Sequence, residues 1–231
     1  MYSIQPKLTF AILLMLLLYA APAPGQEFVT PSDYFDRVSS RFGAVTDYSA
    51  VVTIDQNDGE LVMKGEMMYR SPNKMRIDFQ EPREQVLAMD GEKLTIYIPT
   101  YSYILEQQLK RRSEATVALM ASNQELAYLR ENYSVAYQVG PDPVPLEEGS
   151  DEMVVKLKFQ SRSSMDGFRQ LVISFRSDGM IRRVVGTMPG KTLMMDFTSI
   201  QINPGIPEER FRYEAPVHAN VYKDFLFEGM E

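Results

Sequence analysis

The side chains that most often carry enzyme chemistry are scarce in this chain. It has no cysteine and a single histidine, His218, which lies between Val217 and Ala219 near the C-terminus. A chain without cysteine has no thiol nucleophile, and one histidine leaves little room for a histidine-based triad or a zinc site. We therefore expect no enzyme activity, no metal and no cofactor, and interpret His218 as an ordinary surface or packing residue.

Adjacent carboxylates are a second kind of candidate catalytic group, because paired acids can act as general acid and general base. Three acidic pairs lie in expected loops or at strand ends: Glu147-Glu148, Asp151-Glu152 and Glu208-Glu209. In such places solvated charge explains a pair better than catalysis does. A hydrolase built on Ser and Lys stays open as an alternative, although no motif supports it.

The N-terminal segment is typical of a secretory signal peptide. Lys7 supplies a positive charge, residues 8–21 form an apolar run, and residues 23–25 offer small side chains for cleavage. The run is too short to span a bilayer comfortably, which makes a membrane anchor the less favoured alternative. We expect residues 1–25 to be removed and residues 26–231 to form one exported domain that relies on burial rather than disulfides.

The charge balance is acidic. The full chain has 24 Lys and Arg against 31 Asp and Glu, a net charge of -7, and residues 1–25 contribute only the charge of Lys7. An acidic surface repels phosphate backbones and anionic headgroups. We therefore expect no nucleic-acid partner.

The elements that must position any site are mostly short strands. Their apolar and polar residues alternate, and the turns between many of them are only a few residues long. The predicted strands are residues 48–56, 60–70, 74–80, 85–90, 93–98, 103–108, 133–139, 153–160, 170–175, 181–186 and 191–202. Turns this short join antiparallel neighbours, because parallel pairs need long crossovers. The sequence predicts an α+β protein with one large antiparallel sheet, and a sheet of that size tends to curl.

One face of this sheet is consistently apolar. In the third strand Met75, Ile77 and Phe79 alternate with Lys74 and Arg76, and similar alternation recurs in the other strands. If the sheet curls with its apolar face inward, its concave side needs a cover.

The predicted helices are the available cover. Thr30 can cap a helix that begins at Pro31 and stops at Gly43. A pair of short helices is expected within residues 114–132, between two strands.

A run of short motifs resembles the LolA family of periplasmic outer-membrane lipoprotein carriers. The motifs are residues 69–76 (Tyr-Arg-Ser-Pro-Asn-Lys-Met-Arg), Glu81-Pro82, Asp90-Gly91, 97–99 (Tyr-Ile-Pro) and 211–216 (Phe-Arg-Tyr-Glu-Ala-Pro). The resemblance implies an incomplete β-barrel of about 11 strands, with an N-terminal helix and two mid-chain lid helices over an apolar cavity. It implies an acyl-chain cavity formed by Met63, Met67, Met75, Ile77, Phe79, Leu94 and Ile96. It implies a lid formed by Val117, Leu119 and Met120.

The chain departs from the family pattern at two places. The family often has an arginine directly before the proline, whereas here Ser71 stands there and Arg70 lies one residue earlier. A shift of one residue along a strand reverses the face on which a side chain lies. Arg70 is the candidate for the transfer or lid-latch residue on this resemblance. Residues 221–231 extend past the family's usual end.

The resemblance also implies a function and its partners. The protein would be a soluble periplasmic monomer that binds the acyl chains of lipoproteins or another lipid. It would receive them from an inner-membrane release complex and deliver them to an outer-membrane acceptor. The alternatives are a lipid-sensing regulatory protein of the envelope and a carrier of a non-lipoprotein lipid.

Overall fold

A computed structural model of the chain describes residues 29–108, 123–163, 168–214 and 216–224. These residues form two α-helices, α2 (Pro31–Gly43) and α4 (Asn123–Asn132), and two 3-10 turns, η2 (Pro99–Tyr101) and η3 (Glu208–Phe211). The strands are β1 (Asp47–Gln56), β2 (Leu61–Arg70), β3 (Lys74–Glu81), β4 (Val86–Met89), β5 (Lys93–Ile98), β6 (Tyr103–Gln108), β7 (Tyr133–Tyr137), β8 (Val144–Pro145), β9 (Met153–Ser161), β10 (Gln170–Phe175), β11 (Ile181–Met188), β12 (Lys191–Ile202) and β13 (Asn220–Lys223). In the described part, neither helix is long and apolar enough to cross a membrane.

The strands pair in one curved sheet with the order β13-β6-β5-β4-β3-β2-β1-β12-β11-β10-β9-β7, and β8 pairs with β9 beside this path. The pairing of β13 with β6 is parallel, whereas the other pairs in the described sheet are antiparallel. The predicted large antiparallel sheet is confirmed, and its 11 expected strands are all present. The two short strands β8 and β13 were not predicted.

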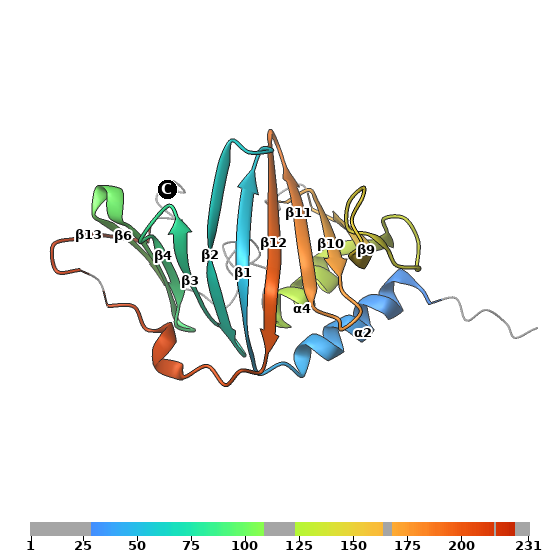
Figure 1. Ribbon diagram of the computed structural model, residues 1–231, viewed down its shortest axis with the longest axis horizontal. Coiled ribbons are helices and arrows are strands. Elements are labelled where there is room, and N and C mark those ends of the chain that lie inside the picture. Colours follow the sequence, from blue (N-terminus) through green and yellow to red (C-terminus); the bar gives the residue numbers. More distant parts are fainter. Residues whose placement is uncertain (1–28, 109–122, 164–167, 215, 225–231) are drawn as a thin grey trace, which may run out of the picture.

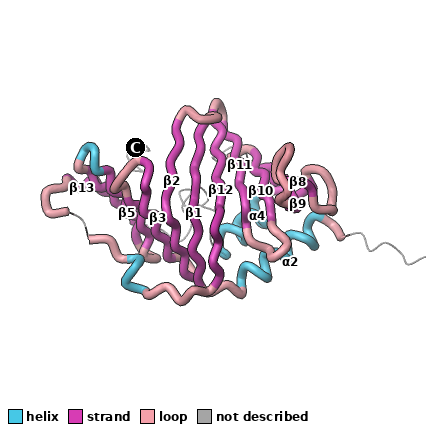
Figure 2. The backbone as a smooth tube through the Cα atoms, viewed as in Figure 1, coloured by secondary structure: helices cyan, strands magenta, loops and turns pink. Residues whose placement is uncertain are grey.

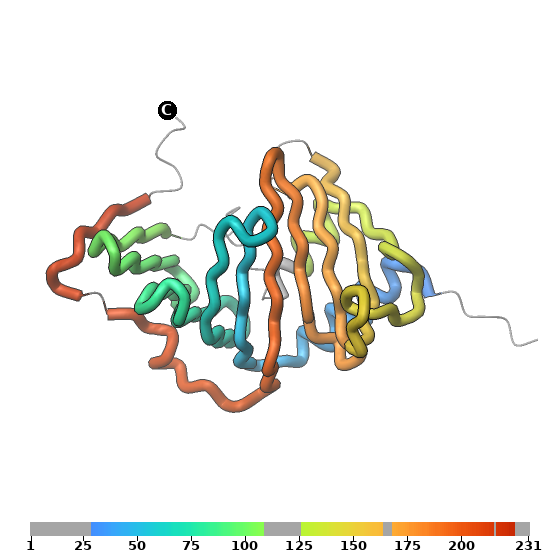
Figure 3. The backbone as a smooth tube through the Cα atoms, turned by 45° about the horizontal axis from the view of Figure 1, so that its top comes forward, coloured from blue at the N-terminus to red at the C-terminus, as the bar shows by residue number. Residues whose placement is uncertain are grey.

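The helices cover only part of the sheet. Figures 1 and 2 show α2 and α4 gathered at the half formed by β7 and β9–β12, whereas no described α-helix lies against β3–β6. The tube in Figure 3 shows the curvature of the sheet between these two halves. This arrangement is an incomplete barrel with a covered half and a half that the described helices leave open.

Helix α2 begins and docks as its sequence predicts. The Asp33 N–H donates to Thr30 Oγ1 over 3.1 Å, and the Asp33 carboxylate accepts from the Thr30 N–H, which completes a capping box. Phe35, Val38 and Phe42 recur at helical spacing and are all buried. The helix therefore packs its apolar stripe onto the sheet.

The two faces of the sheet have different covers. Met67 belongs to the main core with α2 and α4, whereas its neighbour Met68 points the other way and packs with Ile206 and Phe211. The outer face carries the polar residues of the alternating strands, such as Lys74 and Arg76, yet residues 203–214, which we call the C-terminal segment, cover part of it. In Figure 1 this segment runs from the end of β12 across the base of the sheet toward η3.

Polar contacts fix the C-terminal segment to the outer face. Asp47, which is only 6% exposed, accepts from the N–H groups of Gly205 and Ile206 at 2.9 and 3.2 Å. Arg76 Nη1 donates to the carbonyl oxygens of Arg210 and Arg212, each over 3.2 Å. This segment, which contains η3 but no strand, is thereby held against β1–β3 by its own backbone groups.

Candidate functional site on the concave face

The inner face of the sheet is largely apolar. Residues that lie directly opposite each other on neighbouring strands share a face. One row across β1–β6 is Ala50, Met67, Ile77, Leu87, Ile96 and Leu105. The next row is Tyr48, Tyr69, Met75, Met89, Leu94 and Gln107. We call these two rows the inner surface.

The seven residues predicted to line a cavity all lie on this face of the sheet. Five of them are buried: Met67, Met75, Ile77, Phe79 and Leu94. Met63 and Ile96 are half-buried. The structure therefore brings the predicted residues together on β2–β5, and their role in holding an acyl chain stays a prediction.

The inner surface meets solvent at the edge formed by β5, β6 and β13. Ile98 and Leu105 are half-buried, and the nearby Tyr103 and Tyr222 are 37% and 47% exposed. The two tyrosine rings meet edge to face with their centroids 4.9 Å apart. At this edge the inner face of β5 and β6 is therefore partly exposed.

At the opposite half, α2 and α4 pack directly on the sheet. The Phe35 ring of α2 meets the Phe159 ring of β9 edge to face, with centroids 4.9 Å apart. Leu126 and Leu129 of α4 join the same core. An ion pair of 2.6 Å between Arg130 and Asp36 links the two helices. The cover over this half is therefore a packed two-helix unit.

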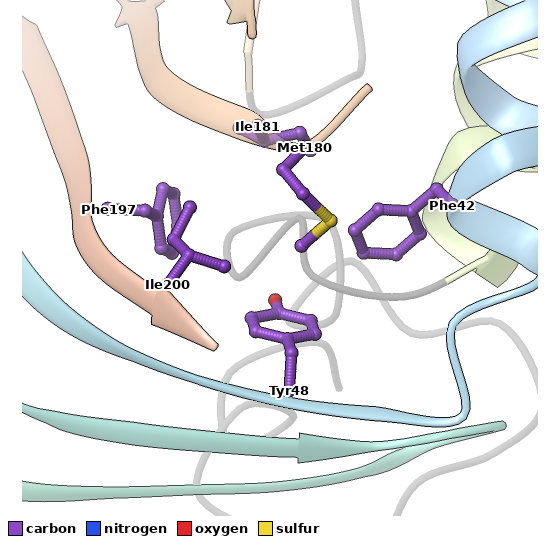
Figure 4. A pocket seen from close by; sticks show the side chains of 6 residues that line it. All are labelled: Phe42, Tyr48, Met180, Ile181, Phe197 and Ile200. Atoms are coloured by element: carbon purple, nitrogen blue, oxygen red, sulfur yellow. The ribbon is translucent and has the colours of Figure 1, made fainter. Parts of the chain in front are cut away.

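A small apolar cavity lies where the C-terminal end of α2 meets the sheet (Figure 4). It is lined by Phe42, Tyr48, Met180, Ile181, Phe197 and Ile200. Its volume is about 10 Å³, which is about the space that one water molecule requires. The space between α2 and strands β1, β11 and β12 is therefore too small for a hydrocarbon chain.

The start of α2 is attached through tyrosines. Tyr137 of β7 donates from its hydroxyl to the carbonyl oxygen of Val29 over 3.0 Å, and the rings of Tyr34 and Tyr137 lie 6.1 Å apart. Burial raises the pKa of the Tyr34 phenol, and the neighbouring Tyr137 raises this pKa further. Burial also raises the pKa of the Tyr137 phenol, so both side chains stay neutral to higher pH than a free phenol does, which suits an apolar contact between helix and sheet.

Comparison with known proteins identifies the family. Residues 43–214 match the family described as outer membrane lipoprotein carrier protein LolA. The chain belongs to the LolA family. An outer-membrane lipoprotein carrier protein of Chromohalobacter salexigens is 26% identical over 193 residues, which cover 82% of this chain and 86% of that protein. One of Pseudomonas fluorescens is 25% identical over 162 residues, covering 69% and 72%.

A solved structure shares the fold of this LolA-family chain. It is that of an uncharacterized conserved protein from Thermus thermophilus, with a TM-score of 0.53 and 16% sequence identity. The match covers 83% of this chain and 98% of that protein. At this identity the likeness establishes the incomplete barrel alone.

The predicted lid residues Val117, Leu119 and Met120 lie outside the described residues, and α4 corresponds to the second predicted mid-chain helix. Arg70 Nη1 donates to the carbonyl oxygen of Ile206 over 2.6 Å. Its guanidinium therefore contacts the C-terminal segment on the outer face, away from the inner surface.

Sequence reasoning missed two residues that shape this LolA-family site. Met180 precedes the predicted strand of residues 181–186 and was assigned to no cavity, yet it lines the cavity beside α2. Tyr137 was expected only as a strand residue, but its hydroxyl holds the start of α2. Both roles depend on contacts between distant segments, which strand alternation does not reveal.

Proposed function

We propose that this LolA-family protein is an exported periplasmic carrier that holds the acyl chains of lipoproteins against the inner surface and delivers them toward the outer membrane. The observation that carries the proposal is the inner surface itself. It is a largely apolar wall across β1–β6 that adjoins the half covered by α2 and α4 and reaches solvent near Tyr103 and Tyr222. The family relationship supports the assignment of lipoproteins as cargo.

Energetics limit how such a carrier can work. Burial of apolar surface is worth about 0.8 kcal/mol per CH₂, so three acyl chains of about fifteen carbons gain about 36 kcal/mol on leaving water. Non-covalent affinities saturate near about 20 kcal/mol, so a carrier that kept all of this gain would never release its cargo. The relevant exchange is between a membrane and the protein, where both environments are apolar and the difference is small.

Methionine suits a surface that must accept and release cargo. Met67, Met75 and Met89 lie on the inner surface, and Met63 lies on the same face of β2. Unbranched thioether side chains repack around different shapes at low cost. The wall can thus adapt to acyl chains without the tight fit that would prevent release.

Entry of cargo requires the helical cover to move. The cavity beside α2 holds about 10 Å³, far less than a hydrocarbon chain needs. Among the described residues, Ser39 of α2 has a buried hydroxyl without a hydrogen-bond partner, and exposure of this group on opening would relieve its desolvation cost. Acyl chains would replace the apolar contacts that α2 loses, so opening costs less with cargo than without it.

A lipopeptide binding assay tests the proposal. We expect the protein to bind a triacylated lipopeptide and to ignore the same peptide without acyl chains. Ile96→Asp places a charge on the inner surface and should weaken binding about tenfold or more. Val62→Asp is the matched control, because Val62 is 45% exposed and faces the outer side of β2. Absence of lipopeptide binding by the wild type, or equal weakening by both variants, would overturn the proposal.

A further inference from the structure

Strand β13 occupies the edge of the sheet in an unusual way. It pairs with β6 in parallel, whereas the other described strand pairs are antiparallel. We propose that the edge of β6 is a docking site for an extended polypeptide segment of a partner protein, and that this segment takes the place of β13. The proposal concerns a protein partner and does not depend on which lipid the protein carries.

Apart from the contact of Tyr222 with Tyr103, the side chains of β13 contribute little to holding it. All four residues are exposed, and Val221 and Tyr222 keep 48% and 47% of their surface in solvent. The strand is held mainly by backbone hydrogen bonds, from Asn220 N–H to Ser102 O over 2.9 Å and from Asp224 N–H to Glu106 O over 2.8 Å. An incoming strand would form the same bonds, so the exchange loses little.

The C-terminal segment, residues 203–214, stays anchored when β13 leaves. Phe211 is only 1% exposed, and Arg76 binds the carbonyl oxygens of Arg210 and Arg212. The Tyr213 ring stacks on Tyr97 with centroids 5.9 Å apart. Between these contacts and β13, Val217 is fully exposed. Displacement can therefore stop at β13 without releasing the outer face of the sheet.

The residues around β13 indicate which segments fit. Tyr222 packs on Tyr103, which in turn lies 5.8 Å from Tyr101, and the Gln107 amide contacts Asp224 Oδ1 at 3.4 Å. The site thus accepts an aromatic side chain followed two residues later by a carboxylate or amide. Half of the exposed large apolar side chains in the described part gather here: Tyr101, Tyr103, Val217, Val221 and Tyr222. Exposed apolar groups concentrated in one place are typical of interaction sites.

Because β13 belongs to the same chain, it competes with any partner at a high effective concentration, of the order of millimolar for a short tether. A free peptide should therefore bind the wild type weakly, and it should bind more tightly once β13 is weakened. This competition makes the site testable without knowledge of the natural partner.

The probe is a labelled synthetic peptide that copies residues 218–224, measured by fluorescence anisotropy with the full chain and no lipid. Every second N–H of β13 points toward β6, as the N–H groups of Asn220 and Asp224 show. Tyr222 lies between these two residues in the same period, so Tyr222→Pro removes an N–H that points toward β6. Lys223→Pro is the matched control, because its N–H points away from β6. Hydrogen exchange of the Ile104 amide, which the same period directs toward β13, reports independently whether the strand has left.

We expect the Tyr222→Pro variant to bind the peptide about tenfold more tightly than the wild type or the Lys223→Pro variant does. Its Ile104 amide should exchange faster and become protected again when peptide is added. Equal affinity for all three proteins would overturn the proposal. Unchanged exchange in the Tyr222→Pro variant would overturn it too, because β13 would then be a fixed part of the sheet. A failure of lipopeptide binding would leave this site unaffected, since the peptide assay contains no acyl chain.

Discussion

Arg41, in the last turn of α2, donates a hydrogen bond from Nη1 to the carbonyl oxygen of Ser177, 3.1 Å away in the turn between β10 and β11. The contact spans the edge of the cavity shown in Figure 4, which Phe42 and Met180 line from the same two elements. Gly179, with a φ of +88°, lies directly under the Arg41 side chain. The helix is thus tied to the sheet beside the cavity, at the point where the proposed carrier function requires the two to separate.

Removal of this tie should speed the opening of α2. Arg41→Ala is expected to raise the rate at which a fluorescent fatty acid enters the protein, measured by stopped-flow fluorescence. It should also lower the free energy of unfolding by about 1 kcal/mol, because one hydrogen bond is lost. Arg37→Ala is the control, because Arg37 is exposed on the same helix. Equal uptake rates for the two variants would contradict a tethering role for Arg41.

The apolar stripe of α2 should dominate the stability of the covered half. Phe35 is 2% exposed and contacts Phe159 edge to face. Phe35→Ala is expected to lower the free energy of unfolding by about 3 to 5 kcal/mol, through lost burial and the cavity left behind. Ser40→Ala on the exposed side of α2 should change it by less than about 0.5 kcal/mol. Urea denaturation measures both, and a Phe35→Ala loss as small as that of Ser40→Ala would count against docking of α2.

High pH should weaken the attachment of α2. Burial raises the pKa values of Tyr34 and Tyr137 above the ordinary value of 10.0. The folded protein therefore holds these protons more tightly than the unfolded chain does. The resulting stabilisation is complete below about pH 10 and disappears as pH rises through the higher folded pKa.

Thermal unfolding between about pH 8 and about pH 11 tests this dependence. The wild type should lose stability at the alkaline end of the range. Tyr137→Phe should lose less over the same interval, although it starts lower because it lacks the hydrogen bond to Val29. If the stability of the two proteins falls equally with pH, ionisation of Tyr137 does not affect folding.

Asp47 should control the C-terminal segment. Asp47→Ala leaves the N–H groups of Gly205 and Ile206 without their acceptor, at a cost of about 1 to 3 kcal/mol. Hydrogen exchange at these two amides should accelerate, whereas Asp151→Ala, a change at an exposed loop residue, should leave it unchanged. Slow exchange at both amides in the Asp47→Ala variant would show that other contacts suffice to hold the segment.

Local sequence patterns predicted much of the fold. Strand alternation placed Met75, Ile77 and Phe79 on one face because successive side chains of a strand point to opposite sides. The capping box at Thr30 and Asp33 defined the start of α2 because its hydrogen bonds join residues three positions apart. The same alternation placed Arg70 on the face opposite Tyr69, where its guanidinium indeed lies.

Features that depend on distant partners could not be predicted in this way. Residues 203–214 contain prolines and no periodic alternation of apolar and polar side chains. Their position is fixed by contacts with Asp47 and Arg76, which lie far earlier in the chain. Strand β13 is only four residues long and pairs with β6 across more than a hundred positions. The closed cavity beside α2 depends on how Phe42 packs against Met180, which no local pattern specifies.

Native mass spectrometry of the protein purified from its own envelope, without detergent and without any delipidation step, tests the carrier function most directly. We predict a population whose mass exceeds that of the polypeptide by an acylated molecule, and loss of that added mass in the Ile96→Asp variant. Recovery of the bare polypeptide alone from such a preparation would contradict the carrier function.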